Sequence, residues 1–310
     1  MAFLGAAAIT ATFQLLGFCA ACAMRTEMFY DVFGGLNFIA LAAYSTLGQP
    51  GGLGRLSNRS LIITCAFIVS RAWLLLFLGW RAHARGGDSR FDPLLRPKKG
   101  PIRYGMFLVF WVAQGVWVYC LSAPMLFINN NDSVGPAPNE IFGSGHILDT
   151  LLFLGFAFGI AIEIIADIQK ARWVAAGRQG GFCSIGVWSL SRHPNYFGEM
   201  LQWLCCWLLA YSSSQAGLSD PVWWATSVSP LFTFHILMNT AATGVAQANG
   251  KGLKRYYESV YADAYRKYRA STSILIPMVG YKYVPMWLKR TLFLDLERYE
   301  YRPRERKKSE

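Results

Sequence analysis

The chain has 310 residues, of which 54% are hydrophobic and only 15% are charged. A soluble domain usually carries about 25% charged residues, so this composition excludes an ordinary soluble protein and favours one that crosses a membrane several times. The formal net charge is +12, but the basic residues flank apolar stretches, so we expect no nucleic acid among the partners.

Apolar stretches of about 20 residues, the length of a transmembrane helix, follow one another along the chain. We expect spans at Ala2–Met24, Val32–Leu53, Leu61–Trp80, Tyr104–Ile128, Ile147–Ile168, Met200–Tyr211 and Val222–Thr243. Glycine and proline interrupt the second stretch and the sixth is short, so the sequence predicts six or seven spans. The expected fold class is an all-α, polytopic transmembrane bundle with a basic, helical cytosolic segment at the C-terminus.

Charge in the connecting segments predicts the orientation. The loop Arg81–Arg103 and the segment after Gly250 are strongly basic, whereas the loop Asn129–His146 has no Lys or Arg. The positive-inside rule places the first two, and with them the C-terminus, in the cytosol. Lys307 and Lys308, close to the end, look like a dilysine retrieval signal, so we expect an integral protein of the endoplasmic reticulum. Attraction of a basic tail to anionic lipid is the alternative explanation.

Polar residues at helical spacing mark the cytosolic ends of two neighbouring spans. They are Glu163, Asp167 and Lys170 on the fifth predicted span and Asn195, Glu199 and Gln202 on the sixth. Both sets fall at i, i+4 and i+7, on one face of a helix. Charged groups at membrane depth are costly, so we expect them either to pair between the helices or to face a hydrated site. The four His and seven Cys show no zinc-ligand spacing, and we expect no metal site.

The connector between these spans contains Arg172, Arg178 and Arg192 among several glycines. Arginine forks bind phosphate, and glycine lets the backbone approach a ligand, so the connector suits a phosphate-bearing cofactor or a lipid headgroup. Downstream, tyrosines recur at helical spacing among basic residues, between Tyr257 and Tyr268. Such a helix suits a membrane interface, or it closes over a cofactor.

Three motifs identify a family resemblance. The stretch "SRHPNYFGE" at Ser191–Glu199, with "EIIADIQK" before it and "YADAYRKYRASTSILIP" after it, resembles the DUF1295 family, which is related to the C-terminal domain of steroid 5-alpha-reductases and to sterol C14 reductases. The resemblance covers roughly Leu61–Pro277. It implies N-terminal transmembrane helices over residues 1–60, a reductase-like membrane domain over 61–280 and a basic cytosolic tail over 281–310.

The resemblance to the reductases implies NADPH as cofactor and a particular set of contacts. These are Asp167, Lys170, Trp188, Arg192, His193, Asn195, Tyr261 and Tyr268, to which the basic connector adds Arg172. Glu199 stands where the reductases place a carboxylate between cofactor and substrate. We regard Tyr196 and Glu199 as the candidate catalytic acids, because reduction needs a group that donates a proton.

The expected function is therefore an NADPH-dependent reduction of a lipophilic enone or enoyl substrate that enters from the bilayer. The expected partners are membrane lipids and a membrane complex. Two alternatives stay open. The core of the motif is shared with isoprenylcysteine and phospholipid methyltransferases, which bind S-adenosylmethionine, although the Glu-Glu pair that those enzymes carry after the last span has no counterpart in "NGKGLKRYY". The other alternative is a non-catalytic membrane subunit or scaffold that retains the fold.

Overall fold

The computed structural model describes residues 2–85, 88, 91–131, 147–240 and 244–301. Regular structure in these ranges is helical, apart from one isolated β-bridge between Ser191 and Ser273. The expected all-α class is thereby confirmed. The Lys307–Lys308 signal and most of the loop that has no Lys or Arg, residues 132–146, lie outside the described residues.

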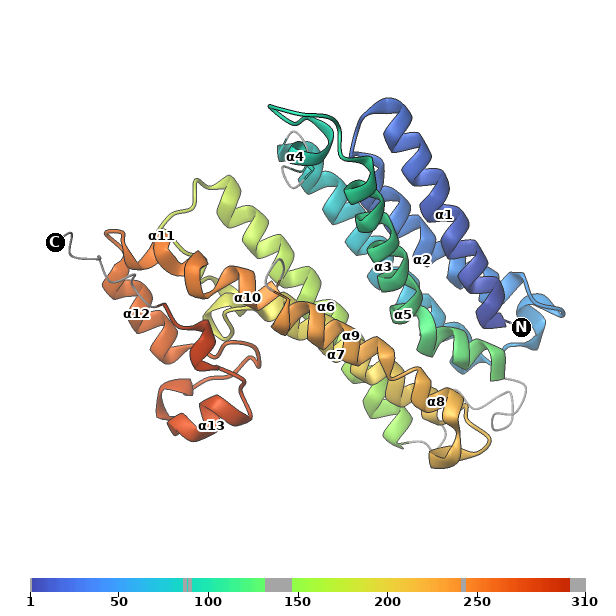
Figure 1. Ribbon diagram of the computed structural model, residues 1–310. Helices are drawn as coiled ribbons and strands as arrows, with labels where there is room; N and C mark the ends of the chain where they lie inside the picture. The colour runs from blue at the N-terminus through green and yellow to red at the C-terminus, as the bar shows by residue number, and fades with distance from the viewer. Residues whose placement is uncertain (1, 86–87, 89–90, 132–146, 241–243, 302–310) are drawn as a thin grey trace. The chain divides into compact units, whose positions relative to one another are not determined.

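The chain forms two compact units. The first unit comprises Met1–Leu154 and Leu204–Phe232. In it α1 (Ala2–Met24), α2 (Phe29–Leu47), α3 (Asn58–Arg85) and α5 (Tyr104–Asn131) pack against one another (Figure 1). The short helix α4 (Asp92–Leu95) adds Leu94 and Leu95 to an aromatic core around Phe91, Phe107 and Trp111.

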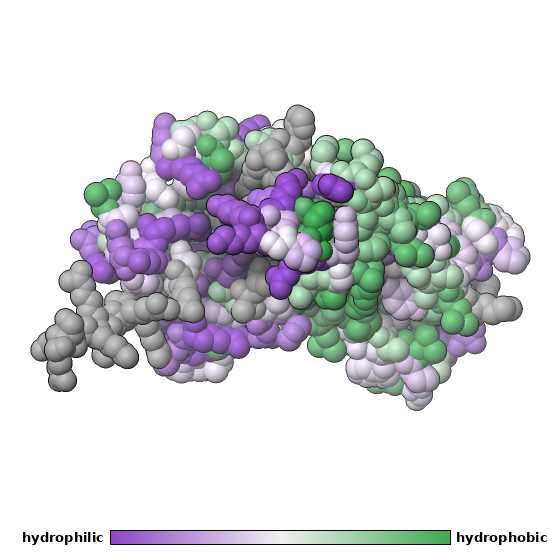
Figure 2. Space-filling model, turned by 45° about the horizontal axis from the view of Figure 1, so that its top comes forward, coloured by the Kyte–Doolittle hydropathy of each residue, from purple (hydrophilic) through white to green (hydrophobic). Residues whose placement is uncertain are grey.

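Within the described ranges, four helices are long and apolar enough to cross a membrane: Ala2–Met24, Asn58–Ala82, Tyr104–Asn131 and Ile147–Ala175. Large hydrophobic side chains lie on their outer surfaces, among them Leu4, Val109 and Leu151, and Figure 2 shows extended hydrophobic areas on the face in view. Such surface is stable when lipid replaces water around it, so the chain is an integral membrane protein.

The other predicted spans differ from the structure. Helix α2 ends at Leu47 and not at Leu53, because Gly51 and Gly52 take positive φ angles of 87° and 53° that open a turn. The expected last span is divided into α8 (Pro221–Ala225), α9 (Val228–Phe234) and a π-helical turn at His235–Asn239. Of the six or seven spans that the sequence predicts, the structure therefore supports the four helices named above.

The second unit comprises Gly155–Trp203 and Thr233–Glu310. It holds the later part of α6 (Ile147–Ala175) and the first part of α7 (Pro194–Tyr211), followed by α10 (Gly244–Ala248), α11 (Lys254–Tyr257), α12 (Ala262–Ser271) and α13 (Met286–Thr291). Part of the expected tail is folded here, since Tyr281 and Tyr299 are 0% and 2% exposed. The candidate site lies in this unit.

Candidate functional site

Two glycines bring α6 and α7 into backbone contact. A Cβ atom on Gly198 would lie 2.6 Å from the carbonyl oxygen of Gly159, and one on Gly159 would lie 2.8 Å from the carbonyl oxygen of Gly198. Real side chains do not tolerate such distances, so only glycine allows the helices to cross this closely. The crossing sets the two predicted polar stripes side by side.

Side-chain amides from α7 meet carboxylates from α6. Gln202 donates from Nε2 to Glu163 Oε2 at 2.5 Å, and Asn195 donates from Nδ2 to Asp167 Oδ1 at 3.4 Å. Glu163, Asp167 and Gln202 are all buried. Glu199 belongs to the same predicted stripe, but its Oε1 accepts the indole N–H of Trp203 at 2.8 Å. The expected pairing between the helices is thus present at Asn195 and Gln202.

Trp188 holds the end of the connector against α6. Its indole N–H donates to the carbonyl oxygen of Ala166 at 2.9 Å, and the ammonium of Lys170 lies 4.4 Å from the ring centroid, a cation–π distance. The Tyr268 hydroxyl donates to the Trp188 carbonyl oxygen at 2.6 Å. Burial raises the pKa of Tyr268, so this phenol stays protonated and keeps its bond.

Glycines shape the start of the connector. Gly177, with φ of 78°, follows the last residues of α6 and ends the helix in the left-handed conformation. Gly181 also has a φ of 78°, and a Cβ there would lie 2.2 Å from the ring of Tyr261. Arg172, on the last turn of α6, is exposed. Arg172 and Tyr261 therefore lie at the outer edge of the connector.

The tyrosine-rich helix α12 packs on this connector. The ring of Phe182 lies 5.1 Å, centroid to centroid, from the rings of both Tyr265 and Tyr268, and 6.4 Å from that of Tyr256. Burial raises the pKa of Tyr265 to about 12. Two of the tyrosines predicted to lie at a membrane interface or to close a site thus pack against the protein.

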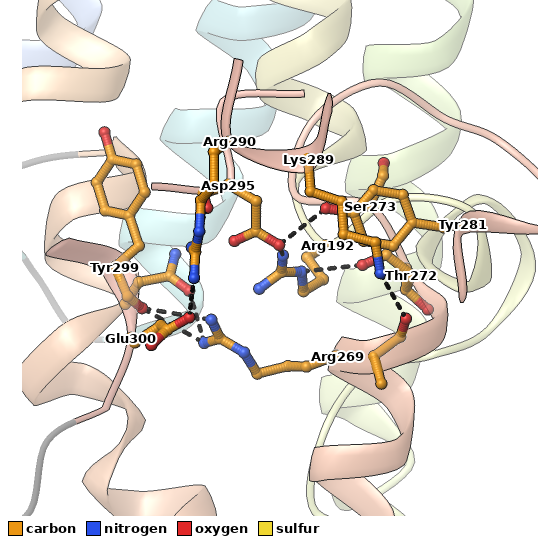
Figure 3. Close-up of polar contacts among 12 residues, drawn as sticks. Arg192, Arg269, Thr272, Ser273, Tyr281, Lys289, Arg290, Asp295, Tyr299 and Glu300 are labelled. Carbon is orange, nitrogen blue, oxygen red and sulfur yellow. Dashed lines mark hydrogen bonds and ion pairs between the residues drawn. The ribbon is translucent and has the colours of Figure 1, made fainter. Parts of the chain in front are cut away.

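Arg192 is held by the C-terminal segment (Figure 3). Its guanidinium forms an ion pair with Asp295 and donates from Nε to the carbonyl oxygen of Thr272 at 3.2 Å. Its backbone N–H donates to the carbonyl oxygen of Ser273 at 2.8 Å, and the Tyr281 hydroxyl also donates to Asp295, at 2.9 Å. With the side chain only 3% exposed, Arg192 ties the connector to the C-terminal segment.

The tautomer of His193 follows from its neighbour Asn249. The Asn249 amide nitrogen donates to the carbonyl oxygen of Val245 at 2.9 Å, and its oxygen faces Arg269 Nη1 at 3.4 Å. The same amide nitrogen lies 2.9 Å from His193 Nε2, which must therefore accept the bond. His193 is then neutral, with its proton on Nδ1. Its ring stacks on Tyr196, 5.2 Å between centroids and 2° between planes.

The electrostatic field at His193 is positive. Its pKa lies well below the ordinary value, first because the imidazole is buried and then because of the positive charges of Lys170, Arg192 and Arg269. The pKa of Arg269 is lowered in turn, by its burial and by Arg192. Three cations of the second unit thus act on one buried, uncharged imidazole.

Three buried polar atoms in this cluster lack a hydrogen-bond partner. Arg192 Nη1, Asn195 Oδ1 and Asp295 Oδ1 form no hydrogen bond within the described part of the chain. A guanidinium N–H suits a phosphate oxygen, and an amide oxygen suits a hydroxyl or amide donor. An unpaired donor and acceptor beside several cations fit a charged, hydrogen-bonding ligand.

The structure connects most of the predicted site residues. Those joined by the contacts above are Asp167, Lys170, Trp188, Arg192, His193, Asn195, Tyr196 and Tyr268. Arg172 and Tyr261 lie at the edge, and Glu199 faces Trp203. Asn249 and Asp295 were not identified from the sequence as residues of the site. The sequence contains one signal that could have identified Asp295, since this residue is the first carboxylate after Asp263 in a strongly basic stretch.

Comparison with known proteins identifies a single family. The model of a family described as "Protein of unknown function (DUF1295)" matches residues 17–272. Searches among curated proteins and among solved structures find no match. The matched range contains every predicted site residue and ends before Asp295.

Proposed function

The chain belongs to the DUF1295 family, and we propose that its second unit binds NADPH and reduces a lipophilic substrate that enters from the bilayer. The observation that supports this most is the positive cluster at His193. Lys170, Arg192 and Arg269 all help to lower the pKa of this buried imidazole, so the cluster offers several positive charges to an anionic ligand. The pyrophosphate and the 2′-phosphate of NADPH are such anions.

The chain's own residues would bind and orient this cofactor. The guanidinium Nη1 of Arg192 and the ammonium of Lys170 would hold phosphate oxygens, and Asn195 Oδ1 would accept from a hydroxyl or an amide. When bound, NADPH supplies a hydride. The rings of Trp188 and Tyr268 fix the connector in place, so that the polar atoms are preorganised before the ligand arrives.

Reduction also needs a proton at the substrate. The Tyr196 phenol stacks on neutral His193 and is half-buried, so it would donate a proton beside the positive field. Glu199, half-buried and bonded to Trp203, would do so in its protonated form. We propose Tyr196 and Glu199 as the two catalytic candidates, and an enone or enoyl lipid as the substrate class.

The proposed location is the endoplasmic-reticulum membrane, with the C-terminus in the cytosol. The support for it is the basic composition of the segment after Gly250 and of the sequence around Lys307. A cytosolic C-terminus would give the second unit access to the soluble cofactor pool. A protease-protection assay on sealed microsomes, with an epitope at the C-terminus, would test the orientation.

A ligand-stabilisation experiment tests the function. The purified protein in detergent is heated with NADPH, NADH or S-adenosylmethionine, because a ligand that binds only the folded state raises stability, by about 2.7 kcal/mol at a hundred times its Kd. We expect NADPH to raise the unfolding temperature. Stabilisation by S-adenosylmethionine alone would favour methyl transfer, and no effect of any of the three would favour a scaffold.

Single-residue variants test where NADPH binds. Asn195→Ala and Lys170→Ala should each weaken the binding of NADPH by roughly tenfold, about 1.4 kcal/mol, because each removes one polar contact to a charged ligand. Lys267→Ala is the matched control, an exposed cation on α12 outside the cluster, and should bind as the wild type does. Equal affinity of all three variants would contradict the assignment of the site.

A further inference from the structure

The segment Val279–Leu294 divides its apolar residues into two sets. It contains Lys282, Lys289 and Arg290 and no carboxylate. Tyr281 and Phe293 point inward, 0% and 7% exposed, with ring centroids 5.5 Å apart. These inner residues fix the segment to the second unit.

The exposed large apolar residues of the segment form what we call the outer patch. Its members and their exposures are Val279 at 84%, Tyr283 at 78%, Met286 at 61%, Trp287 at 68% and Leu292 at 59%. So many large apolar residues, all exposed and within one short segment, mark an interaction surface. Trp and Tyr are also the residues that collect where hydrocarbon meets water, at the level of the lipid headgroups.

The contacts at the two ends of the segment place it beside the start of α7. The Met278 N–H donates to the carbonyl oxygen of Leu190 at 3.2 Å, and Asp295 pairs with Arg192. Leu190 and Arg192 lie four and two residues before Pro194, the first residue of α7. Asn195 in turn contacts Asp167 near the end of α6, one of the helices that can cross a membrane. The segment is thus anchored where a candidate span ends.

Charge indicates the kind of membrane surface. Lys282 is exposed, with its ammonium 4.7 Å from the centroid of the Tyr283 ring. Lys289 is half-buried, with its ammonium 4.3 Å from the Tyr281 ring, and donates to the carbonyl oxygen of Ala270 (Figure 3). Lysines beside exposed aromatic residues, with no carboxylate among them, complement anionic headgroups.

We propose that the outer patch docks on the anionic phospholipid surface of the membrane that the spans cross, with Trp287 and Met286 inserted at headgroup depth and Lys282 on lipid phosphates. This assignment is independent of the proposed cofactor, because none of its residues belongs to the cluster around His193. It makes the C-terminal segment a second, peripheral contact with the membrane.

Photo-crosslinking of the full-length protein tests the proposal. A benzophenone amino acid replaces Trp287 in one variant and Asp263, whose side chain is 88% exposed on α12, in the control. Both are reconstituted in nanodiscs of phosphatidylcholine, with or without phosphatidylserine, and the adducts are identified by mass spectrometry. We expect at least about fivefold more lipid adduct at position 287 than at 263, rising further with phosphatidylserine.

A second variant separates charge from insertion. Adding Lys282→Glu to the position-287 variant should remove the increase caused by phosphatidylserine while leaving the adduct with phosphatidylcholine. Equal lipid yields at positions 287 and 263 would overturn the proposal. So would adducts at position 287 with a second copy of the chain instead of lipid, or a yield at 287 that does not depend on phosphatidylserine.

Discussion

The carboxylate of Asp295 pairs with the guanidinium of Arg192, which lies 103 residues earlier in the chain. Asp295 lies outside the range that matches the DUF1295 family, whereas Arg192 lies within it. A residue beyond the family match therefore holds a predicted cofactor contact in position and supplies its counter-ion.

Removing this carboxylate should destabilise the protein. In Asp295→Ala the buried guanidinium keeps its charge without a counter-ion, a situation that costs about 3–5 kcal/mol. We expect a markedly lower unfolding temperature in detergent, measured by circular dichroism. The control is Glu258→Ala, which removes an exposed partner of Lys254 and should change little. If Asp295→Ala unfolds as the wild type does, Arg192 is not held in this way.

The close crossing of α6 and α7 should not accept a side chain at Gly198. Gly198→Ala sets a methyl group against the backbone of Gly159, and the helices must separate, at a cost of about 1–3 kcal/mol. Gly79→Ala on α3 is the matched control, since a Cβ there meets nothing within 4 Å. It should leave stability equal or slightly raised. Thermal unfolding of both variants checks this, and equal losses would contradict the crossing.

Stability should depend on pH through His193. Its pKa in the folded protein is below the value of 6.5 in the unfolded chain, so the unfolded state takes up the proton first. The contribution of neutral His193 is complete above about pH 6.5 and declines as the pH falls below it, by up to about 1.4 kcal/mol per pH unit.

The variant His193→Gln isolates this effect. It keeps an acceptor for Asn249 but has no titratable group, so its loss of stability between about pH 7.5 and 5.5 should be smaller than that of the wild type. Unfolding temperatures measured across this range give the difference. Identical pH profiles would show that His193 does not stay neutral in the folded protein.

A second buried ion pair, in the first unit, should contribute as much to stability as the pair of Arg192 and Asp295. Asp149 accepts from Arg59 Nε at 2.5 Å and from Ser212 Oγ at 2.6 Å, and its side chain is 4% exposed. Asp149→Ala leaves Arg59 without its counter-ion and should cost about 3–5 kcal/mol. Asp263→Ala, which removes an exposed partner of Arg266, should cost less than about 1 kcal/mol. Chemical unfolding in mixed micelles would show the contrast, and matching losses would argue against the network.

The helices and the polar faces were accessible to sequence reasoning because both are local properties. Helix α1 has the predicted bounds, and α5 and α6 begin at the predicted residues, since a long apolar run requires a helix wherever lipid surrounds it. The spacing of Asp167 and Lys170, and of Asn195 and Gln202, follows from 3.6 residues per turn. The sequence determined these, together with the family.

Only the tertiary structure decided which polar groups meet. No local pattern connects Arg192 to Asp295, orients Asn249 towards His193, or divides the expected last span at Thr226 and Ser227. Charge and hydrogen bonding act between atoms that are close in space, and folding brings distant residues together at a conformational cost that no local window records. The sequence therefore determined the helices and their polar faces, and the packing of the second unit decided which cations remain near His193.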